Sequence, residues 1–355
     1  MSIKPILGEI TDGRRMTDAE FLSLYSEAEL LNLAEASTAV RDRMFPEGLI
    51  TFIIDRNINY TNICVCGCKF CAFYRPPGHE QGYVLGWPEI RKKIQEAVDA
   101  GATQVMIQGG LHPDLKIDYF ADMFKNIRSD FPQIVIHSLT APEVTHIAKI
   151  SGLTTFETLK QLKNAGMASL PGGGAEVLDD RVREAISPNK INTKQWLKVM
   201  EEAHQLGIET TATMMLGSVD KIEERLGHLS RLRQLQDKTG GFRAFIMWAY
   251  NPGNNELMGK KIGTLEYLRM LALSRLYLDN FKHIQGSWVT QGRAVGQVSL
   301  LFGADDLGST MLEENVVRAT GLENRMSVES MVNIIQDAGK TAALRDTEYK
   351  ILKVF

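Results

Sequence analysis

Eight consecutive residues contain all four cysteines of the 355-residue chain: Cys64, Cys66, Cys68 and Cys71. Cysteines one or two residues apart form strained disulfides at best, and a disulfide framework would spread its cysteines over distant loops. Thiolates gathered in one short loop can instead bind a metal together. The spacing therefore predicts a metal site in this loop.

Three of these cysteines, Cys64, Cys68 and Cys71, have the spacing C-x3-C-x2-C. Three thiolates on one loop can hold three irons of a [4Fe-4S] cluster and leave the fourth iron without a protein ligand, as a reaction site. A closed structural zinc site needs four ligands, usually two pairs far apart in the sequence. A local zinc site that uses all four thiols, or reactive thiols without a metal, remain alternatives. Cys66 is the spare thiol of the cluster hypothesis, and it could exchange with Cys64.

The composition is that of a soluble globular protein, since 44% of the residues are hydrophobic and 23% are charged. The 40 Lys and Arg residues against 43 Asp and Glu give a net charge of -3, so no overall positive field attracts nucleic acid or anionic lipid. The start of the chain lacks the apolar core of a signal peptide, and no later segment reaches the roughly 18 uncharged apolar residues of a membrane span. We expect a cytoplasmic enzyme without a nucleic-acid or membrane partner.

From residue 49 onward, short β-branched runs alternate with longer amphipathic segments, which is the pattern of a parallel sheet built from βα units. Strands are expected at 49–57, 104–108, 133–138, 167–170, 209–216, 242–248 and 283–289, with a weaker one at 302–305. The clearest helices are expected at 88–100, 117–129, 193–205, 221–235 and 264–280. Nearer the N-terminus, Thr17 and Glu20 form a capping box that predicts the start of a helix.

Eight βα units predict an α/β protein with a (β/α)8 TIM-type barrel. Because the last strand is weak, an open or partial barrel remains an alternative, and a doubly wound sheet is less favoured. We expect residues 1–48 to form an N-terminal helical extension, and residues 49–355 to form the barrel with a C-terminal helical tail.

In a βα barrel, functional groups lie at the carboxyl ends of the strands, where the βα loops converge. The cysteine loop follows the first expected strand. Gln108, Gly109 and Gly110 lie at the end of the second strand, and Ser138 ends the third. The sequence therefore predicts one functional site at this end of the barrel.

The pattern C-x3-C-x-aromatic-C after the first strand of such a barrel resembles the radical S-adenosylmethionine superfamily. In that superfamily, the open iron of a [4Fe-4S] cluster binds the amino and carboxylate groups of S-adenosylmethionine. The resemblance implies that Cys64, Cys68 and Cys71 are the metal ligands. It also implies an oxidoreductase with the cluster and S-adenosylmethionine as its two cofactors.

Further motifs narrow this resemblance over most of the chain. The segments DRNINYTN (55–62), CKFCAFYR (68–75) and QGGLHP (108–113) resemble the branch of futalosine-pathway and deazaflavin-forming enzymes. Within that branch, SRL with LDN (274–280) and GSWVTQG (286–292) are most similar to the cyclic dehypoxanthine futalosine synthase family of menaquinone biosynthesis.

The resemblance implies a cyclase that converts dehypoxanthine futalosine to cyclic dehypoxanthine futalosine. A 5'-deoxyadenosyl radical would take a hydrogen atom from the ribose C4', and the carbon radical would add to the benzoate ring. The partners implied are this small-molecule substrate and an electron donor such as flavodoxin or ferredoxin. The alternatives are an aminodeoxyfutalosine synthase, a deazaflavin-synthase-like enzyme and, from another class, an iron-sulfur or zinc protein that senses iron or redox state.

The resemblance also implies a cofactor site around the cluster. Gln108, Gly109 and Gly110 would receive the methionine end of the cofactor, although the glutamate that the superfamily usually has there is absent, and Ser138 would lie nearby. Glu176 and Arg183 are seven residues apart, which is two turns of a helix, and could bind the ribose and carboxylate of the cofactor. A surface ion pair is nearly as common at that spacing.

Charged residues further along the chain are candidates for the reaction itself. Asp305 and Glu314 are candidates for the proton acceptor that the cyclisation needs. Arg56, Arg75 and Arg293 are candidates for holding the benzoate carboxylate through a bidentate guanidinium. Each of the five could instead be a solvated or structural charge.

Overall fold

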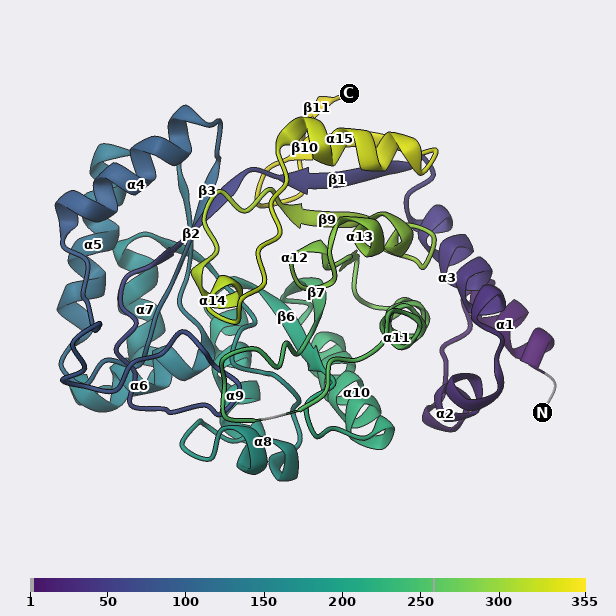
Figure 1. Ribbon diagram of the computed structural model, residues 1–355, viewed down its shortest axis with the longest axis horizontal. Coiled ribbons are helices and arrows are strands. Elements are labelled where there is room, and N and C mark those ends of the chain that lie inside the picture. The colour runs from purple at the N-terminus through teal and green to yellow at the C-terminus, as the bar shows by residue number, and fades with distance from the viewer. Residues whose placement is uncertain (1–2, 258) are drawn as a thin grey trace.

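The computed structural model describes residues 3–257 and 259–355. Its centre is a curled sheet of 11 strands, with helices around it (Figure 1). The strands are β1 (Leu49–Ile53), β2 (Asp55–Asn59), β3 (Gln104–Gln108), β4 (Val135–Ser138), β5 (Met167–Leu170), β6 (Glu209–Leu216), β7 (Phe242–Ala249), β8 (His283–Gln285), β9 (Asp306–Ser309), β10 (Thr341–Arg345) and β11 (Ile351–Val354). The helices are α1 (Ile3–Thr11), α2 (Asp18–Glu27), α3 (Leu30–Met44), α4 (Trp87–Asp99), α5 (Ile117–Asp130), α6 (Ala141–Ser151), α7 (Thr155–Ala165), α8 (Asp180–Ile186), α9 (Thr193–Gln205), α10 (Ile222–Thr239), α11 (Thr264–Tyr277), α12 (Trp288–Gln291), α13 (Arg293–Ser299), α14 (Asn315–Arg318) and α15 (Val328–Asp337).

The strand order of the sheet is β11-β10-β1-β9-β8-β7-β6-β5-β4-β3-β2. The described neighbours pair in parallel except β10 and β11, which are antiparallel. β1 and β2 stand far apart in this order although only Ile54 separates them in the chain. The sheet therefore curls so far that Ile54 connects β1, near one edge, with β2 at the other edge. The predicted TIM-type fold is confirmed in its open form, because the hydrogen-bonded strand order is linear and does not close into a ring.

The helices pack on this sheet through apolar residues at helical spacing. In α9, the buried Trp196, Val199, Met200 and Ala203 recur every three or four residues, so they share one face of the helix. Other residues of the same helix, such as Lys198, are exposed. This periodicity is the signal that made the segment predictable as a helix between two strands.

Two strands near the C-terminal end of the barrel differ from the prediction. The strand expected at 283–289 ends at Gln285, because the backbone N–H of Ser287 donates to the Tyr267 hydroxyl at 2.8 Å instead of to a neighbouring strand. The strand expected at 302–305 is found at Asp306–Ser309. Gly303 has φ +86°, a left-handed conformation that interrupts a strand.

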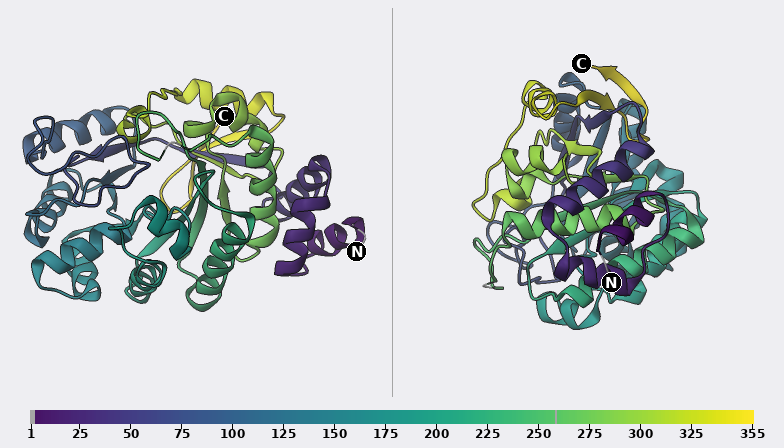
Figure 2. Two further views of the ribbon diagram at one scale, coloured as in Figure 1. Left: turned by 60° about the horizontal axis from the view of Figure 1, so that its bottom comes forward. Right: turned by 90° about the vertical axis from the view of Figure 1, so that its right-hand side faces the viewer.

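Three helices precede the sheet, where the sequence predicted a single helical segment. The capping box is confirmed: the Glu20 N–H donates to Thr17 Oγ1 at 3.3 Å, and the Thr17 N–H donates to the Glu20 carboxylate at 2.9 Å. Figure 2 shows α1, α2 and α3 together at one end of the molecule, beyond α11. Arg269 of α11 donates to the carbonyl of Ala28 at 2.7 Å and so ties the two parts together. The division of the chain at residue 48 stays a prediction.

The hairpin of β10 and β11 covers the amino end of the barrel. Arg345 of β10 forms an ion pair with Asp306 at 2.6 Å, and the ring of Tyr349 stacks on His283 with the ring centres 3.5 Å apart. His283 and Asp306 are the first residues of β8 and β9, so these contacts lie at the end opposite the βα loops. The expected helical tail thus consists of one helix, α15, followed by this hairpin.

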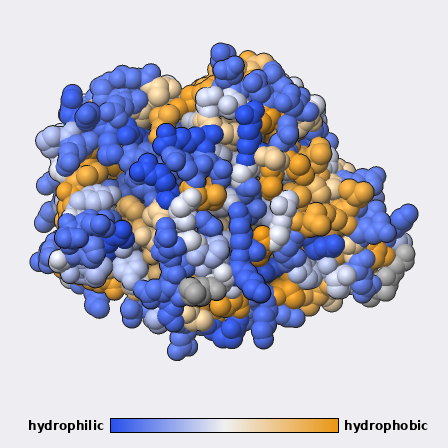
Figure 3. Space-filling model, in the orientation of Figure 1, coloured by the Kyte–Doolittle hydropathy of each residue, from blue (hydrophilic) through white to orange (hydrophobic). Residues whose placement is uncertain are grey.

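The surface in Figure 3 is mostly hydrophilic, with scattered hydrophobic patches. Among the helices of the described ranges, none has the length and apolar character needed to cross a membrane.

Candidate functional site

The cysteine loop follows β2 and is tied to its surroundings by backbone hydrogen bonds. The Cys64 N–H donates to the Arg75 carbonyl at 2.9 Å, and the Val65 N–H donates to the Leu111 carbonyl at 3.0 Å. None of the four cysteines forms a disulfide, and the Sγ atoms of Cys66 and Cys68 lie 3.4 Å apart. The loop is therefore fixed both to its own outgoing segment and to the loop after β3.

A cavity of about 180 Å³ opens beside this loop, and we call it the cluster cavity. The four cysteines line it together with Gln108, Gly109, Gly110, Glu176, Lys190 and Val316. The structure thus brings the predicted metal ligands, the predicted glycine segment and Glu176 to one place. Within the described ranges, no three His, Cys, Asp or Glu side chains converge on a point that would suit a single metal ion. A cluster places its ligands on separate irons, so its thiols need not converge on one point.

The glycine segment after β3 packs very closely against the cysteine loop. A Cβ on Gly110 would lie 2.2 Å from the Ile63 carbonyl oxygen, so no larger residue fits there without moving the loop. The Gly109 N–H donates to Glu143 Oε1 at 2.9 Å. These contacts leave the wall of the cluster cavity at this point without side chains.

Glu143 is a buried carboxylate of this region that the sequence analysis did not select. It also accepts hydrogen bonds from the Tyr60 hydroxyl at 2.9 Å and the Thr140 hydroxyl at 2.6 Å. Burial raises the pKa of Glu143 to about 7, although these donors and the Gly109 N–H oppose the shift. Through the Gly109 N–H, Glu143 fixes the glycine segment from outside the cluster cavity, which it does not line.

Glu176 and Lys190 form a buried ion pair on the wall of the cluster cavity, and Lys190 is a second residue that the sequence analysis missed. Lys190 Nζ lies 2.5 Å from Glu176 Oε1 and 5.1 Å from the centre of the Phe70 ring. Burial lowers the pKa of Lys190, but Cys68 and Glu176 raise it further, so the lysine is held in its charged form. The other carboxylate oxygen of Glu176, Oε2, is buried with no hydrogen-bond partner among the described residues.

The predicted pairing of Glu176 with Arg183 on one helical face is wrong. Glu176 precedes α8 and has φ +44°, outside any helix. Arg183 lies in α8 and donates to the carbonyls of Gly174, Ala175 and Ile191, at distances of 2.5 to 3.1 Å. It therefore supports the loop that carries Glu176, and it does not line the cluster cavity.

Replacing Lys190 with Met is expected to destabilise the fold by about 3–5 kcal/mol, because the buried Glu176 carboxylate loses its partner. Denaturant unfolding of the metal-free protein measures this change. Lys198→Met is the control, because that lysine is exposed and lies 3.5 Å from Glu202, so little change is expected. A Lys190 variant as stable as the control would contradict the ion-pair interpretation.

A second and larger cavity, of about 330 Å³, occupies the inside of the barrel, and we call it the barrel cavity. Its walls include apolar side chains of several strands, among them Ile53, Met106, Ile246 and Trp248. Gln108 and Val316 line both this cavity and the cluster cavity. The two cavities are therefore adjacent, so a molecule in the barrel lies next to the cysteine loop.

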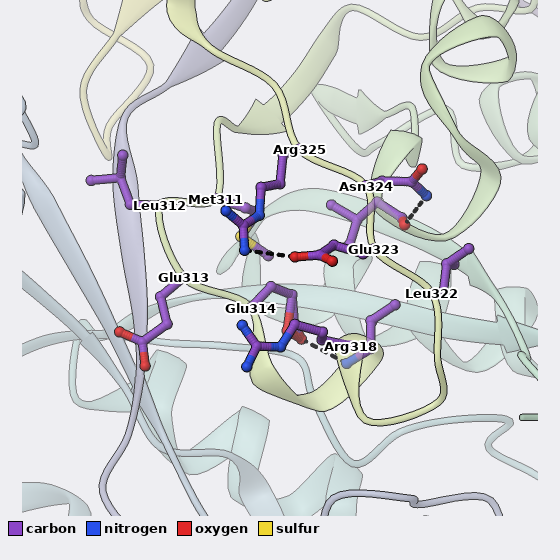
Figure 4. A pocket seen from close by; sticks show the side chains of 11 residues that line it. Met311, Leu312, Glu313, Glu314, Arg318, Leu322, Glu323, Asn324 and Arg325 are labelled. Carbon is purple, nitrogen blue, oxygen red and sulfur yellow. Dashed lines mark hydrogen bonds and ion pairs between the residues drawn. The ribbon is translucent and has the colours of Figure 1, made fainter. Parts of the chain in front are cut away.

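Glu314 lines the barrel cavity, and its role as proton acceptor stays a prediction. It caps the N-terminus of α14 by accepting hydrogen bonds from the N–H groups of Val316 and Val317, both at 3.1 Å. Burial raises the pKa of Glu314 to about 7 against the effect of these donors. Glu314 lines the barrel cavity and also a side pocket of about 110 Å³, where Figure 4 shows Glu313 and Glu314 pointing to different sides.

Asp305, the last residue of the strand expected at 302–305, does not lie at the carboxyl end of a strand. Because β9 begins at Asp306, Asp305 lies at its amino end. Its buried carboxylate is paired with Arg275 and lies 2.6 Å from His283 Nδ1. Burial raises the pKa of Asp305, but Arg275 and His283 lower it more, so it stays below its ordinary value. These contacts make Asp305 a structural charge.

Ser138 and Arg293 are also placed outside the two cavities. The Ser138 hydroxyl is buried and donates to the Ile107 carbonyl at 2.9 Å, between neighbouring strands. Arg293 is exposed at the start of α13. The structure therefore does not bring either residue to the cysteine loop.

The other two arginines selected for the carboxylate are used elsewhere. Arg56 forms ion pairs with Glu96 at 2.5 Å and Glu313 at 2.6 Å. Arg75 donates to the Tyr74 carbonyl at 2.8 Å and to the Gln81 side chain at 2.9 Å. Neither arginine lines the barrel cavity.

Asp305→Asn is expected to cost about 3–5 kcal/mol of stability, because it leaves the buried Arg275 without its counter-charge. The variant is also expected to keep the pH profile of the wild-type activity at a temperature where it stays folded. Denaturant unfolding and a pH series measure the two effects. Asp122→Asn is the control for stability, because Asp122 is exposed and lies 3.3 Å from an equally exposed Lys125. Loss of a titration from the pH profile of Asp305→Asn would restore a catalytic role.

Comparisons with known proteins agree with this arrangement. Residues 58–232 match the radical SAM superfamily, and residues 239–355 match the CofH/MqnC C-terminal region. Among solved structures, the FeFe-hydrogenase maturase HydG from Carboxydothermus hydrogenoformans has the same fold, with a TM-score of 0.78 over 98% of this chain and 80% of that one. At 17% sequence identity, that likeness concerns the fold alone.

Several curated relatives match nearly the whole chain, and three of them describe its family. Two are named cyclic dehypoxanthine futalosine synthase: the Streptomyces coelicolor protein is 48% identical over 99% of this chain and 89% of its own, and the Halalkalibacterium halodurans protein is 44% identical over 100% and 96%. An aminodeoxyfutalosine synthase of Thermus thermophilus is 38% identical over 99% and 96%. The chain therefore belongs to the radical SAM superfamily, whose members are enzymes that use a [4Fe-4S] cluster and S-adenosylmethionine, and within it to the group with the CofH/MqnC C-terminal region.

Proposed function

We propose that this chain catalyses the cyclisation of dehypoxanthine futalosine to cyclic dehypoxanthine futalosine, as a step of menaquinone biosynthesis. The observation that supports this most is its identity of 48% and 44%, over nearly its full length, to two relatives with that name. The two adjacent cavities agree with it, because one suits a cofactor at the cysteines and the other, beside it, has apolar walls that suit the aromatic ring of the substrate.

In this proposal Cys64, Cys68 and Cys71 hold three irons of the cluster, and Cys66 is not a ligand. The chemistry of the donor set fits the group, since the three thiols line one cavity that also has an open wall at Gly109 and Gly110. When bound, the cluster and S-adenosylmethionine supply a 5'-deoxyadenosyl radical that can take a hydrogen atom from a substrate carbon.

The residues around the cysteine loop would then position the cofactor. Gly109 and Gly110 offer backbone without side chains, so a cofactor can approach closely, and Glu143 keeps that backbone in place. Glu176 Oε2, which lacks a partner among the described residues, is available to accept a hydrogen bond from a cofactor amine or hydroxyl. Gln108 lies between the cofactor and the substrate.

Glu314 is the proton acceptor in this proposal. Restoring an aromatic ring after a carbon radical has added to it requires loss of one electron and one proton from the substrate. The proton needs a base, and the electron would pass to the oxidised cluster held by Cys64, Cys68 and Cys71. Glu314 lines the barrel cavity with a pKa of about 7, which suits a general base near neutral pH. The reducing electron that starts turnover is proposed to come from a donor such as flavodoxin or ferredoxin.

Product mass separates this function from its nearest alternative, an aminodeoxyfutalosine synthase. The reconstituted protein is incubated anaerobically with S-adenosylmethionine, a reductant and either dehypoxanthine futalosine or an enolpyruvyl benzoate. A product two hydrogens lighter than dehypoxanthine futalosine is expected, together with free 5'-deoxyadenosine. An adenine-bearing product from the enolpyruvyl benzoate would overturn the proposal in favour of the alternative.

A further inference from the structure

Four ionisable side chains of Asp, Glu and Arg residues line the barrel cavity. For three of them, either a counter-charge neutralises the side chain or burial disfavours its charged form. Arg345 is held by Asp306, with contacts of 2.6 and 3.0 Å. Burial raises the pKa of both Asp55 and Glu314, to about 7 for Glu314, which disfavours their negative charge. The fourth charged residue is Arg243, near the start of β7.

Arg243 lacks a close counter-charge. Its Nη2 donates to Ser169 Oγ at 3.0 Å and to His137 Nδ1 at 3.2 Å, both of them uncharged acceptors. The nearest carboxylate in the described part of the chain is that of Glu209, 4.0 Å from Nη1, on a side chain that is 60% exposed. No other atom of the guanidinium has a hydrogen-bond partner among the described residues, although the Arg243 side chain itself is only 11% exposed.

His137 is an uncharged acceptor that holds the guanidinium in place. Burial and the charge of Arg243 lower the pKa of His137 well below its ordinary value, so the imidazole is neutral. Its Nδ1 also lies 2.6 Å from Ser169 Oγ, so the three side chains form one small network. The orientation of Arg243 is therefore fixed, while its charge meets only the distant and largely exposed Glu209 carboxylate at 4.0 Å. A bound anion would complete this arrangement.

The position of Arg243 fits one end of an elongated ligand. It lies five residues before Trp248 on β7, which corresponds to about 16 Å along a strand. Trp248 and Ile246 line the cavity between that point and the mouth, where Gln108 borders the cluster cavity. A molecule that reaches from the mouth toward the floor would place an apolar ring against these side chains and a charged group at Arg243.

We propose that Arg243 is the residue that binds the aryl carboxylate of the substrate and so selects a carboxylate-bearing aromatic ring. A guanidinium can bind a carboxylate with two parallel hydrogen bonds, which fixes the ring as well as the charge. This inference rests on the proposed function, because it takes its ligand from dehypoxanthine futalosine. It also gives the carboxylate a site that Arg56, Arg75 and Arg293 do not provide.

The test compares dehypoxanthine futalosine with its carboxamide analogue, which has the same shape without the charge. Dissociation constants of both compounds are measured by equilibrium dialysis with the reconstituted holoenzyme, for wild type, Arg243→Gln and Arg243→Lys. Wild type is expected to bind the acid about 100-fold more tightly than the amide. Arg243→Gln is expected to bind both within about threefold, by losing affinity for the acid alone. Arg243→Lys is expected to fall between them, because it keeps the charge without the two-pronged geometry.

Arg91→Gln is the control, since this exposed arginine pairs with Asp130 on the helical surface, and it is expected to keep the full preference for the acid. Thermal unfolding and S-adenosylmethionine binding check that Arg243→Gln is folded. If this variant is not folded, Arg243→Lys decides the question alone. An undiminished preference for the acid in Arg243→Lys then overturns the inference. Equal preference for the acid in wild type and Arg243→Gln overturns the inference and leaves the proposed function standing. A wild-type protein that binds neither compound overturns both.

Discussion

Cys68→Ala is expected to abolish the activity, because it removes one of only three thiolates that hold the cluster. Wild-type protein reconstituted under anaerobic conditions is expected to bind about four irons and four sulfides per chain and to show the broad visible absorption of such a cluster. In Cys68→Ala, iron content and absorption fall toward background, and cleavage of S-adenosylmethionine stops. Cys64→Ala and Cys71→Ala are expected to behave in the same way.

Cys66→Ala is the matched control, because its Sγ lies only 3.4 Å from that of Cys68 and it lines the same cavity, yet it falls outside the ligand spacing. It is expected to keep most of the iron and most of the activity. A Cys66 variant that is as inactive as Cys68→Ala would show that the choice of ligands is wrong, with Cys66 in place of Cys64. One equivalent of zinc instead of iron in wild type would reject the cluster altogether.

The parts of the site that are local in sequence could be predicted. The cysteine loop and the glycine segment are continuous motifs, and their positions at strand ends follow from the βα pattern. β5 and β6 were predicted with the bounds that the structure has, because each lies between clear breaks: Gly166 and Pro171 flank β5, and Gly207 and Gly217 flank β6. These features need only the sequence neighbours of each residue.

The residues that were missed act through tertiary contacts. Glu143 acts behind the glycine segment, 34 residues away in sequence, and Lys190 reaches Glu176 across a separate loop. A polar residue that is buried has no distinctive local pattern, so neither could be selected from the sequence alone. Arg243 was hidden for the same reason, at the start of a strand that was correctly predicted as a strand.

The misplacement of Asp305 has a different cause. A shift of one strand by a few residues moves a side chain from the carboxyl end of a barrel strand to its amino end. The left-handed φ of Gly303 and the buried pair with Arg275 decided this placement, and neither can be read from an apolar run. The predicted ends of the strands were thus the least accurate part of the sequence analysis. A site residue near such an end, as Asp305 is, was therefore placed at the wrong end of the barrel.

Glu314→Gln is expected to lower the yield of cyclised product about 100- to 10 000-fold, because the amide cannot accept the proton that the substrate must lose. In Glu314 the N–H groups of Val316 and Val317 donate to different carboxylate oxygens, so Gln keeps one of these two acceptors and part of the cap of α14. Thermal unfolding of Glu314→Gln separates loss of this contact from loss of the proton acceptor. Product and 5'-deoxyadenosine are measured together. Formation of 5'-deoxyadenosine is expected to continue, so the ratio of product to 5'-deoxyadenosine falls.

The pH dependence of product formation tests whether Glu314 acts in its carboxylate form. Since burial raises the pKa of Glu314 to about 7, the carboxylate form that can accept a proton is the minor species below pH 7. Product formation in wild type is therefore expected to rise about tenfold per pH unit below that value and to level off above it. Glu313→Gln is expected to keep this rise and plateau, because Arg56 and Lys93 hold the Glu313 carboxylate in its charged form in the wild type. If Glu314→Gln also retained it, the proton acceptor would have to be another group, and Glu314 would be only the cap of α14.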